Sequence, residues 1–136
     1  MSSNSKPQIL LVEDNLEFAE TIKEFIDEFS KYKIVHYSSG KLALEYLNQK
    51  SSEVIGICSD LLMKDMDGID FLAQIRKSKV YGNLPLIFIS GASPMVFKSL
   101  LEPYDYSGFI EKPINYDKLV GMIEMTFPIP KNKRVA

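Results

Sequence analysis

Residues 9–14 have the sequence Ile9-Leu10-Leu11-Val12-Glu13-Asp14. Four consecutive apolar residues are typical of a short strand that is buried on both faces of a parallel sheet. Two acidic residues follow without a spacer, so we expect Glu13 and Asp14 at the carboxyl end of that strand. The same pattern, a buried strand that ends in polar residues, recurs along the chain.

Four more segments are predicted to be strands because they are rich in apolar and β-branched residues: 34–37, 54–58, 86–89 and 108–110. After each strand, apolar residues recur at the steps of three and four that form one face of a helix. These predicted faces are Phe18, Ile22, Phe25, Ile26 and Phe29; Ala43, Tyr46 and Leu47; Phe71, Leu72 and Ile75; Phe97, Leu100 and Leu101, in a helix that begins at Ser93-Pro94; and Tyr116, Leu119, Val120, Ile123 and Phe127. Five strand–helix pairs with short connections predict an α/β fold, a doubly wound parallel sheet with helices on both faces.

The length and composition fit one domain. The chain has 136 residues, of which 46% are hydrophobic and 25% are charged, so it is long enough to bury a core. We expect a domain over residues 8–127 and tails at residues 1–7 and 128–136. The net charge of −2 argues against direct nucleic-acid binding, and we find no segment with the pattern of a signal peptide or membrane span. Because Cys58 is the single cysteine, no disulfide can form within the chain. We expect a cytoplasmic protein.

Polar residues also follow three other predicted strands. Asp60 follows the strand at 54–58, Ser90 the strand at 86–89, and Lys112 the strand at 108–110. Because the carboxyl ends of parallel strands share one edge, these side chains should meet Glu13 and Asp14 there. Three clustered carboxylates repel one another, and a hard cation such as Mg²⁺ relieves that repulsion. The pattern predicts a metal-assisted phosphoryl-transfer site in which a carboxylate is the nucleophile.

Four motifs in this order resemble the signature of response-regulator receiver domains: Glu13-Asp14, Asp60 with the later Met66-Asp67-Gly68, Ser90-Gly91-Ala92, and Lys112-Pro113. The resemblance covers residues 8–127 and is to single-domain regulators of the chemotaxis type. It implies a flavodoxin-like sheet in the order 2-1-3-4-5. It also implies a switch in a two-component phosphorelay that catalyses only its own phosphorylation and dephosphorylation.

The resemblance implies a role for each matching residue. Asp60 would accept a phosphoryl group from a histidine kinase or a histidine phosphotransfer protein. Lys112 would contact both Asp60 and the incoming phosphoryl group, and the Lys112-Pro113 bond would be cis. Mg²⁺ would be bound by Glu13, Asp14, Asp60 and the backbone carbonyl of Leu62.

Ser90 and Phe109 would form the switch that the resemblance implies. Ser90 would move to the phosphoryl oxygens, and Phe109 would rotate into the space that Ser90 leaves. The surface of the fourth helix, fifth strand and fifth helix would then change shape for an output partner or a second copy. We expect a monomer that can dimerise on phosphorylation.

Several positions depart from the usual family pattern. Lys64 stands where the family usually has proline, Ser90 where threonine is common, and residues 103–108 lack the usual alanine-glycine-alanine pattern. Leu62 and Ala92, two residues after Asp60 and Ser90, are apolar and cannot orient an attacking water. We therefore predict slow self-dephosphorylation.

Other functions stay open at this point. A Mg²⁺-dependent aspartyl phosphatase normally has a second acid two residues after the nucleophile, but Leu62 stands at that position here. A flavin-binding module would not place acidic residues in its first loop, as this chain does. An interaction module that is never phosphorylated fits the fold, although the complete set of acceptor residues argues against it. Taken alone, Asp60 would be expected to cap the next helix. We expect structural roles for His36, Cys58, Met63, Met66 and Asp67.

Overall fold

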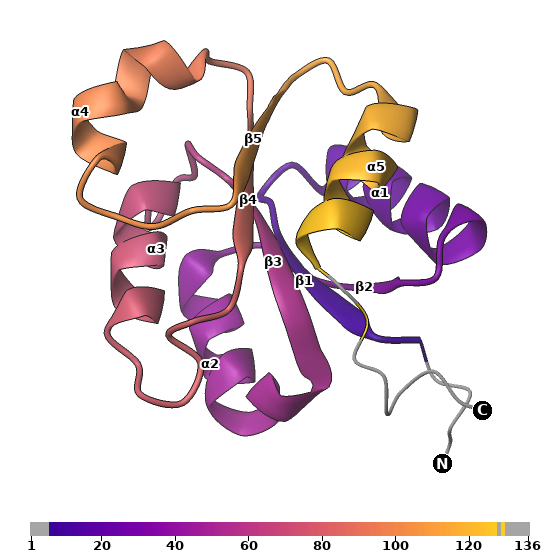
Figure 1. Ribbon diagram of the computed structural model, residues 1–136, viewed down its shortest axis with the longest axis horizontal. Helices are drawn as coiled ribbons and strands as arrows, with labels where there is room; N and C mark the ends of the chain where they lie inside the picture. The colour runs from indigo at the N-terminus through magenta and orange to yellow at the C-terminus, as the bar shows by residue number, and fades with distance from the viewer. Residues whose placement is uncertain (1–5, 128, 130–136) are drawn as a thin grey trace.

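The computed structural model describes residues 6–127 and 129, and their strands and helices alternate along the chain (Figure 1). The elements are β1 (Gln8–Val12), α1 (Leu16–Phe29), β2 (Lys33–Tyr37), α2 (Gly40–Lys50), β3 (Val54–Asp60), α3 (Gly68–Arg76), β4 (Leu86–Ser90), α4 (Lys98–Leu101), β5 (Gly108–Glu111) and α5 (Tyr116–Thr126). Two 3₁₀ helices complete the set, η1 (Ser51–Glu53) before β3 and η2 (Pro94–Phe97) before α4.

The strands form one parallel sheet in the order β2-β1-β3-β4-β5, which confirms the predicted order. Helices α1 and α5 cover one face, and α2, α3 and α4 cover the other (Figure 1). The core accordingly has two halves. One half packs Ile22 of α1 and Ile123 of α5 on the sheet, and the other packs Leu47 of α2 and Phe71 of α3 on the opposite side.

Short polar side chains begin most of the helices. Asn15, Ser39, Asp67 and Asn115 each accept a hydrogen bond from a backbone N–H in the first turn of α1, α2, α3 and α5. Such caps satisfy donors that the helix itself leaves unpaired, and each stabilises a helix by about 1 kcal/mol. Because Asp67 caps α3, Asp60 has no capping role and its carboxylate remains at the end of β3.

Two of the predicted inward-facing residues are wrong, because Phe29 is 68% exposed and Leu100 is 58% exposed. Phe29 is the last residue of α1, where the helix reaches solvent and its ring contacts that of Phe25 instead. The segment after Ser93 begins as a 3₁₀ helix and only then continues as the four-residue α4. A 3₁₀ turn has three residues, so the spacing predicted for an α-helix no longer holds and only Leu101 is fully buried.

Some residues of the predicted tails contact the domain. Pro7 is buried, and its carbonyl accepts a hydrogen bond from the N–H of Lys33 at 3.0 Å. Ile129 packs against the half of the core that holds α1 and α5. The remaining predicted tail residues, apart from Lys6, lie outside the described residues. Among the described residues, no helix has both the length and the apolar character of a membrane span.

Candidate active site

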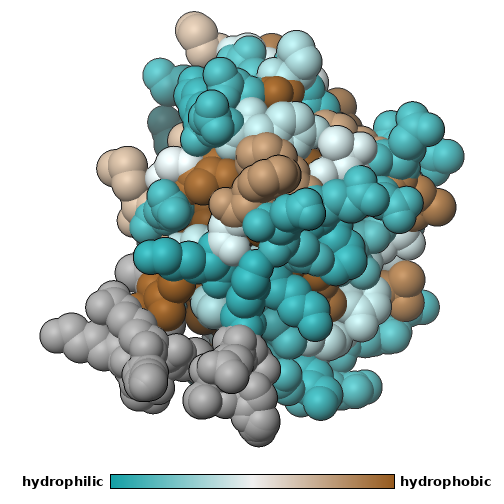
Figure 2. All heavy atoms as spheres, turned by 90° about the vertical axis from the view of Figure 1, so that its right-hand side faces the viewer, coloured by the Kyte–Doolittle hydropathy of each residue, from teal (hydrophilic) through white to brown (hydrophobic). Residues whose placement is uncertain are grey.

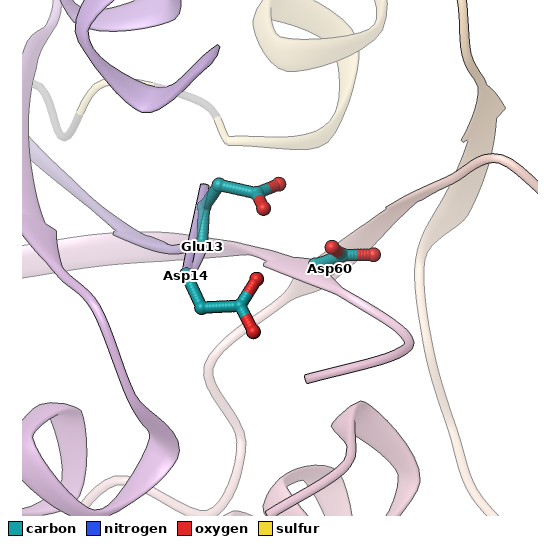
Figure 3. A group of neighbouring side chains, drawn as sticks. All are labelled: Glu13, Asp14 and Asp60. Carbon is teal, nitrogen blue, oxygen red and sulfur yellow. The ribbon is translucent and has the colours of Figure 1, made fainter. Parts of the chain in front are cut away.

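Three carboxylates converge at the carboxyl edge of the sheet. Glu13 and Asp14 directly follow β1, and Asp60 is the last residue of the neighbouring strand β3. One oxygen of each carboxylate lies within 4.8 Å of the others, and Figure 3 shows the side chains pointing toward a common space. The parallel register explains why the three carboxylates lie close together. Val12 of β1 pairs with Ser59 of β3, so both strands end at the same level of the sheet.

Lys112 adds one positive charge to this cluster. Its Nζ lies 3.3 Å from Oε1 of Glu13 and 3.4 Å from Oδ2 of Asp60. The same ammonium lies 4.3 Å from the centroid of the Phe18 ring. Its backbone is fixed as well, because the N–H of Lys112 donates to the carbonyl of Ser90 at 2.8 Å. The Lys112-Pro113 bond is cis, as predicted.

The carboxylate of Asp60 is held in one orientation. Its Oδ1 accepts hydrogen bonds from the N–H groups of Leu61 at 2.7 Å and Leu62 at 3.3 Å, which leaves Oδ2 facing Lys112. Gly68 keeps the start of α3 close, because its N–H donates to the Leu61 carbonyl at 2.7 Å. A Cβ at position 68 would collide with the carbonyl oxygen of Asp60, so only glycine fits there.

Glu13 is the most deeply buried acid of the cluster, with 1% of its surface exposed. The pKa of Glu13 is raised from 4.5 to about 7, chiefly by burial and also by the negative charge of Asp60, while a hydrogen bond from the Asn15 N–H and the charge of Lys112 act in the opposite direction. The carboxylate cluster is thus short of positive charge, since Lys112 is the one cation within ion-pair distance among the described residues.

Asp14 is more open to solvent and contacts the loop that follows β3. Its Oδ2 accepts a hydrogen bond from the backbone N–H of Lys64 at 3.1 Å. A proline at position 64 would lack this donor. The departure from the family pattern at Lys64 therefore has a structural consequence, a direct link between the two loops that carry the acids.

Ser90 lies at the end of β4, which pairs with the strand of Asp60, and Phe109 lies on β5, the next strand along the sheet. Ser90 is buried at the end of β4, and its Oγ accepts a hydrogen bond from the N–H of Ala92 at 3.1 Å. Phe109 of β5 is half-buried, with its ring centroid 6.3 Å from that of Phe88. It also lines a groove of about 370 Å³ between Pro94 and α5. Leu62 turns its side chain toward solvent and is 58% exposed.

The residues expected to be structural make ordinary contacts. His36 bonds through Nε2 to the backbone carbonyl of Glu13 at 2.8 Å, Cys58 is buried, and Met63 and Met66 pack against the core. The contact of Phe18 with Lys112 is the feature that sequence reasoning missed, because it treated Phe18 only as part of an apolar helix face. Its position four residues after Asp14, in the first turn of α1, was the available signal.

The donor set suits a hard divalent cation. Three carboxylate oxygens within 4.8 Å with one nearby lysine leave excess negative charge, and Mg²⁺ prefers oxygen ligands of this kind. The same edge holds a carboxylate 3.4 Å from an ammonium, a pair of groups that is chemically suited to phosphoryl transfer.

Comparison with known proteins agrees with this arrangement. The model of the response regulator receiver domain matches residues 9–124. The chain belongs to this family. Receiver domains of two-component systems are signalling switches. The two-component response regulator ORR3 of Oryza sativa subsp. indica is 30% identical over 110 residues, which are 80% of this chain and 82% of that protein.

Other matches are to parts of larger proteins or to the fold alone. The hybrid signal transduction histidine kinase D of Dictyostelium discoideum is 24% identical over 131 residues, 96% of this receiver chain but 8% of the kinase. The receiver chain spans 8% to 51% of the first curated relatives. The receiver domain of the sensor histidine kinase PA1611 from Pseudomonas aeruginosa PAO1 has the same fold, with a TM-score of 0.81 at 18% identity over 92% of this chain and 100% of that one. A magnesium ion is coordinated in the active site cleft of that protein.

Proposed function

We propose that this receiver domain accepts a phosphoryl group on Asp60 from a phosphohistidine, and that the modification changes the surface of α4, β5 and α5 for a partner. The observation that carries the proposal is the position of Asp60 Oδ2, 3.4 Å from the ammonium of Lys112 and beside two further carboxylates. A single acid with a lysine partner could be a structural ion pair, whereas three acids around one lysine are suited to a metal and an anion.

The transfer is a substitution at phosphorus. Oδ2 of Asp60 attacks the phosphorus atom, and the P–O bond of an acyl phosphate forms. The P–N bond to the donor imidazole breaks, and the imidazole nitrogen keeps the electron pair and takes up a proton from solvent water. Lys112 offsets the charge that develops on the phosphoryl oxygens. The N–H groups of Leu61 and Leu62 hold the other oxygen of Asp60 during the attack.

We propose Glu13, Asp14, Asp60 and the backbone carbonyl of Leu62 as the residues that hold Mg²⁺. When bound, Mg²⁺ neutralises negative charge on the carboxylates and on the phosphoryl group. The magnesium ion in the cleft of the related sensor kinase receiver domain supports the choice of metal.

Ser90 and Phe109 are the proposed switch residues. The phosphoryl group adds about −1.5 to −2 charges and three strong acceptors. The Ser90 hydroxyl, whose Oγ accepts a hydrogen bond from the N–H of Ala92, moves to donate its O–H to a phosphoryl oxygen, and Phe109 moves inward from its half-buried position against Phe88. The groove that Phe109 lines lies between Pro94, at the start of η2, and Lys118 of α5, so its movement reshapes the surface between them.

The proposed phosphodonor is a histidine kinase or a histidine phosphotransfer protein in the cytoplasm, and the match to a stretch of a hybrid signal transduction histidine kinase supports this choice. We propose a monomer that dimerises, or binds an output protein, once it is phosphorylated. With a net charge of −2, the chain is not proposed to bind nucleic acid itself.

The alternative function, an aspartyl phosphatase, is less favoured, because the side chain two residues after Asp60 is that of Leu62, which is exposed and apolar.

Incubation with a small phosphodonor and Mg²⁺, followed by intact-mass measurement, tests the proposal. We expect the mass of one phosphoryl group, stable in acid and labile in base, and no such gain in Asp60→Asn or when the metal is chelated. Asp65→Asn is the matched control, because Asp65 is exposed and lies outside the carboxylate cluster. Phosphorylation of Asp60→Asn to the same extent as the unmodified chain would refute the assignment.

A further inference from the structure

We propose that Phe18 is a positioning residue for phosphoryl transfer, which holds the Lys112 ammonium between Glu13 and Asp60. The inference rests on the proposed function and deepens it. It assigns a role in that reaction to an aromatic residue that is neither one of the acids nor the serine of the proposed site. The observation behind it is the distance of 4.3 Å between Lys112 Nζ and the centroid of the Phe18 ring.

The ring of Phe18 has a fixed position. Phe18 lies in the first turn of α1, and its N–H donates to the capping side chain of Asn15 at 3.0 Å. Its side chain is half-buried and packs against the half of the core that α1 and α5 share. The edge of the sheet and the capped end of the helix therefore place the ring next to the end of β5.

Lys112 has three partners with different properties. Two are the carboxylates of Glu13 and Asp60, at 3.3 and 3.4 Å, and the third is the face of an uncharged ring. A lysine ammonium within about 6 Å of a ring centroid is attracted by the ring's quadrupole. The side chain of Lys112 is only 27% exposed, so water screens this attraction less than at an open surface.

The third partner matters because the first two change during the reaction. In the proposed mechanism Glu13 and Asp60 bind the metal, and Asp60 becomes an acyl phosphate. The ring of Phe18 neither titrates nor binds a cation through oxygen, so its attraction for the ammonium stays constant. It keeps Lys112 within reach of the phosphoryl oxygens while the lysine exchanges carboxylate partners, which raises the fraction of molecules that are ready to react.

A purely structural role makes a different prediction. If Phe18 only fills space beside the core, then side chains of equal size should replace it regardless of ring electrostatics. Fluorination separates the two roles, because it weakens the negative face of the ring while it leaves the shape nearly unchanged. Phe29 is the matched control, since it lies on the same helix and its ring contacts that of Phe25.

The experiment replaces Phe18, and separately Phe29, with phenylalanines that carry one, two and three fluorine atoms. The rate of phosphorylation of the full chain by a small phosphodonor is measured with saturating Mg²⁺, together with the free energy of unfolding. We expect a stepwise fall for the Phe18 series, reaching about threefold to tenfold, with little change in stability and no trend for the Phe29 series. Phe18→Tyr, which keeps a ring face, should stay close to the parent, whereas Phe18→Leu should be as slow as the most fluorinated variant. A rate that does not depend on fluorination at position 18 would overturn the proposal.

A second measurement is independent of phosphorylation. A ring face so near the ammonium should shift the NMR signals of the Lys112 side chain upfield, and Phe18→Leu should remove that shift. If the unmodified chain accepts no phosphoryl group, the proposed function fails, while the shift still reports whether Phe18 holds Lys112. If the shift is absent, the positioning role fails even in a protein that is phosphorylated normally.

Discussion

At the scale of single residues, the loops beside Asp60, the proposed acceptor, carry apolar side chains. Leu62 is two residues after Asp60, and Ala92 is two residues after Ser90. Among the described residues, neither side chain offers a group that could bind and orient a water for attack on an acyl phosphate. The side chain of Leu62 is 58% exposed, and its backbone N–H donates to Oδ1 of Asp60, so we expect a long-lived phosphoryl group.

We predict that Leu62→Asn shortens the half-life of the phosphorylated protein. A side-chain amide at this position can hydrogen-bond an attacking water, and one such bond corresponds to roughly a twofold to tenfold change in rate. The half-life is measured by intact mass after the phosphodonor is removed.

Leu62→Ala is the control for Leu62→Asn, because it removes the apolar bulk without adding a polar group. If Leu62→Ala accelerates hydrolysis as much as Leu62→Asn does, shielding by the leucine is the cause and orientation of water is not. An unchanged half-life in Leu62→Asn would contradict both explanations.

Cys58 gives a second prediction at this scale. It lies in β3 between Leu11 and Ile87, and burial raises the pKa of its thiol to about 12. Compared with a free thiol of pKa about 8.5, its reactive thiolate near pH 8 is scarcer by roughly three orders of magnitude. We expect iodoacetamide to modify the native protein at least about 100-fold more slowly than the urea-unfolded protein. Equal rates would show that β3 is open to solvent.

At the scale of secondary-structure elements, the beginning of α3 is where packing constrains the active site most. We predict that Gly68→Ala destabilises the fold by about 1–3 kcal/mol, as overpacked substitutions do, and slows phosphorylation by displacing Asp60. The reason is the contact of the added methyl group with the carbonyl oxygen of Asp60 and the Cα of Leu61. Urea unfolding and the phosphorylation rate measure the two effects.

Gly121→Ala is the matched control for Gly68→Ala. Gly121 lies within α5, and a Cβ added there has no neighbour within 4 Å. Alanine is favoured over glycine inside a helix by about 0.5–1 kcal/mol, so this variant should be slightly more stable and should be phosphorylated normally. Equal losses in both variants would mean that replacing any helical glycine harms the protein, and that the approach of α3 to Asp60 is not the cause.

The elements also show where sequence patterns are informative. The five strands and the caps follow from local residue types, because an apolar run such as residues 9–12 has few alternatives in a small α/β domain. The inward faces of α1 and α4 were less predictable at their ends. Phe29 and Leu100 fit the helical spacing, yet one lies at the end of a helix and the other follows a 3₁₀ turn. Spacing alone does not encode where a helix ends or how tightly it is wound.

At the scale of the whole molecule, the site depends on topology more than on any one motif. Glu13, Asp60 and Lys112 are far apart in the sequence and meet because β1, β3 and β5 are parallel and end at one edge. The sequence was sufficient to predict this convergence. It was not sufficient to predict the ring of Phe18 under Lys112 or the link from Lys64 to Asp14, because these contacts depend on how the loops pack after the sheet has formed.

We expect the convergence of three acids to make the global stability of the protein depend on Mg²⁺. The folded chain brings Glu13, Asp14 and Asp60 within 4.8 Å, whereas the unfolded chain separates them, so a cation that bridges them binds the native state selectively. Such binding adds about 2.7 kcal/mol to the free energy of unfolding when the free ion is at 100 times its dissociation constant. We therefore expect Mg²⁺ to raise the melting temperature, as measured by scanning calorimetry at constant ionic strength.

Asp14→Asn should remove most of this stabilisation by Mg²⁺, because it takes one charged ligand from the cluster but leaves the ion pairs of Lys112 with Glu13 and Asp60 in place. Glu17→Gln is the control, since Glu17 is an exposed acid in the first turn of α1 outside the cluster, and it should respond to Mg²⁺ like the parent chain. Sodium chloride at equal ionic strength separates specific binding from screening of the acidic edge. An identical rise in melting temperature for Asp14→Asn and Glu17→Gln would mean that Mg²⁺ acts on the surface as a whole, and the three carboxylates would then have no special role in binding it.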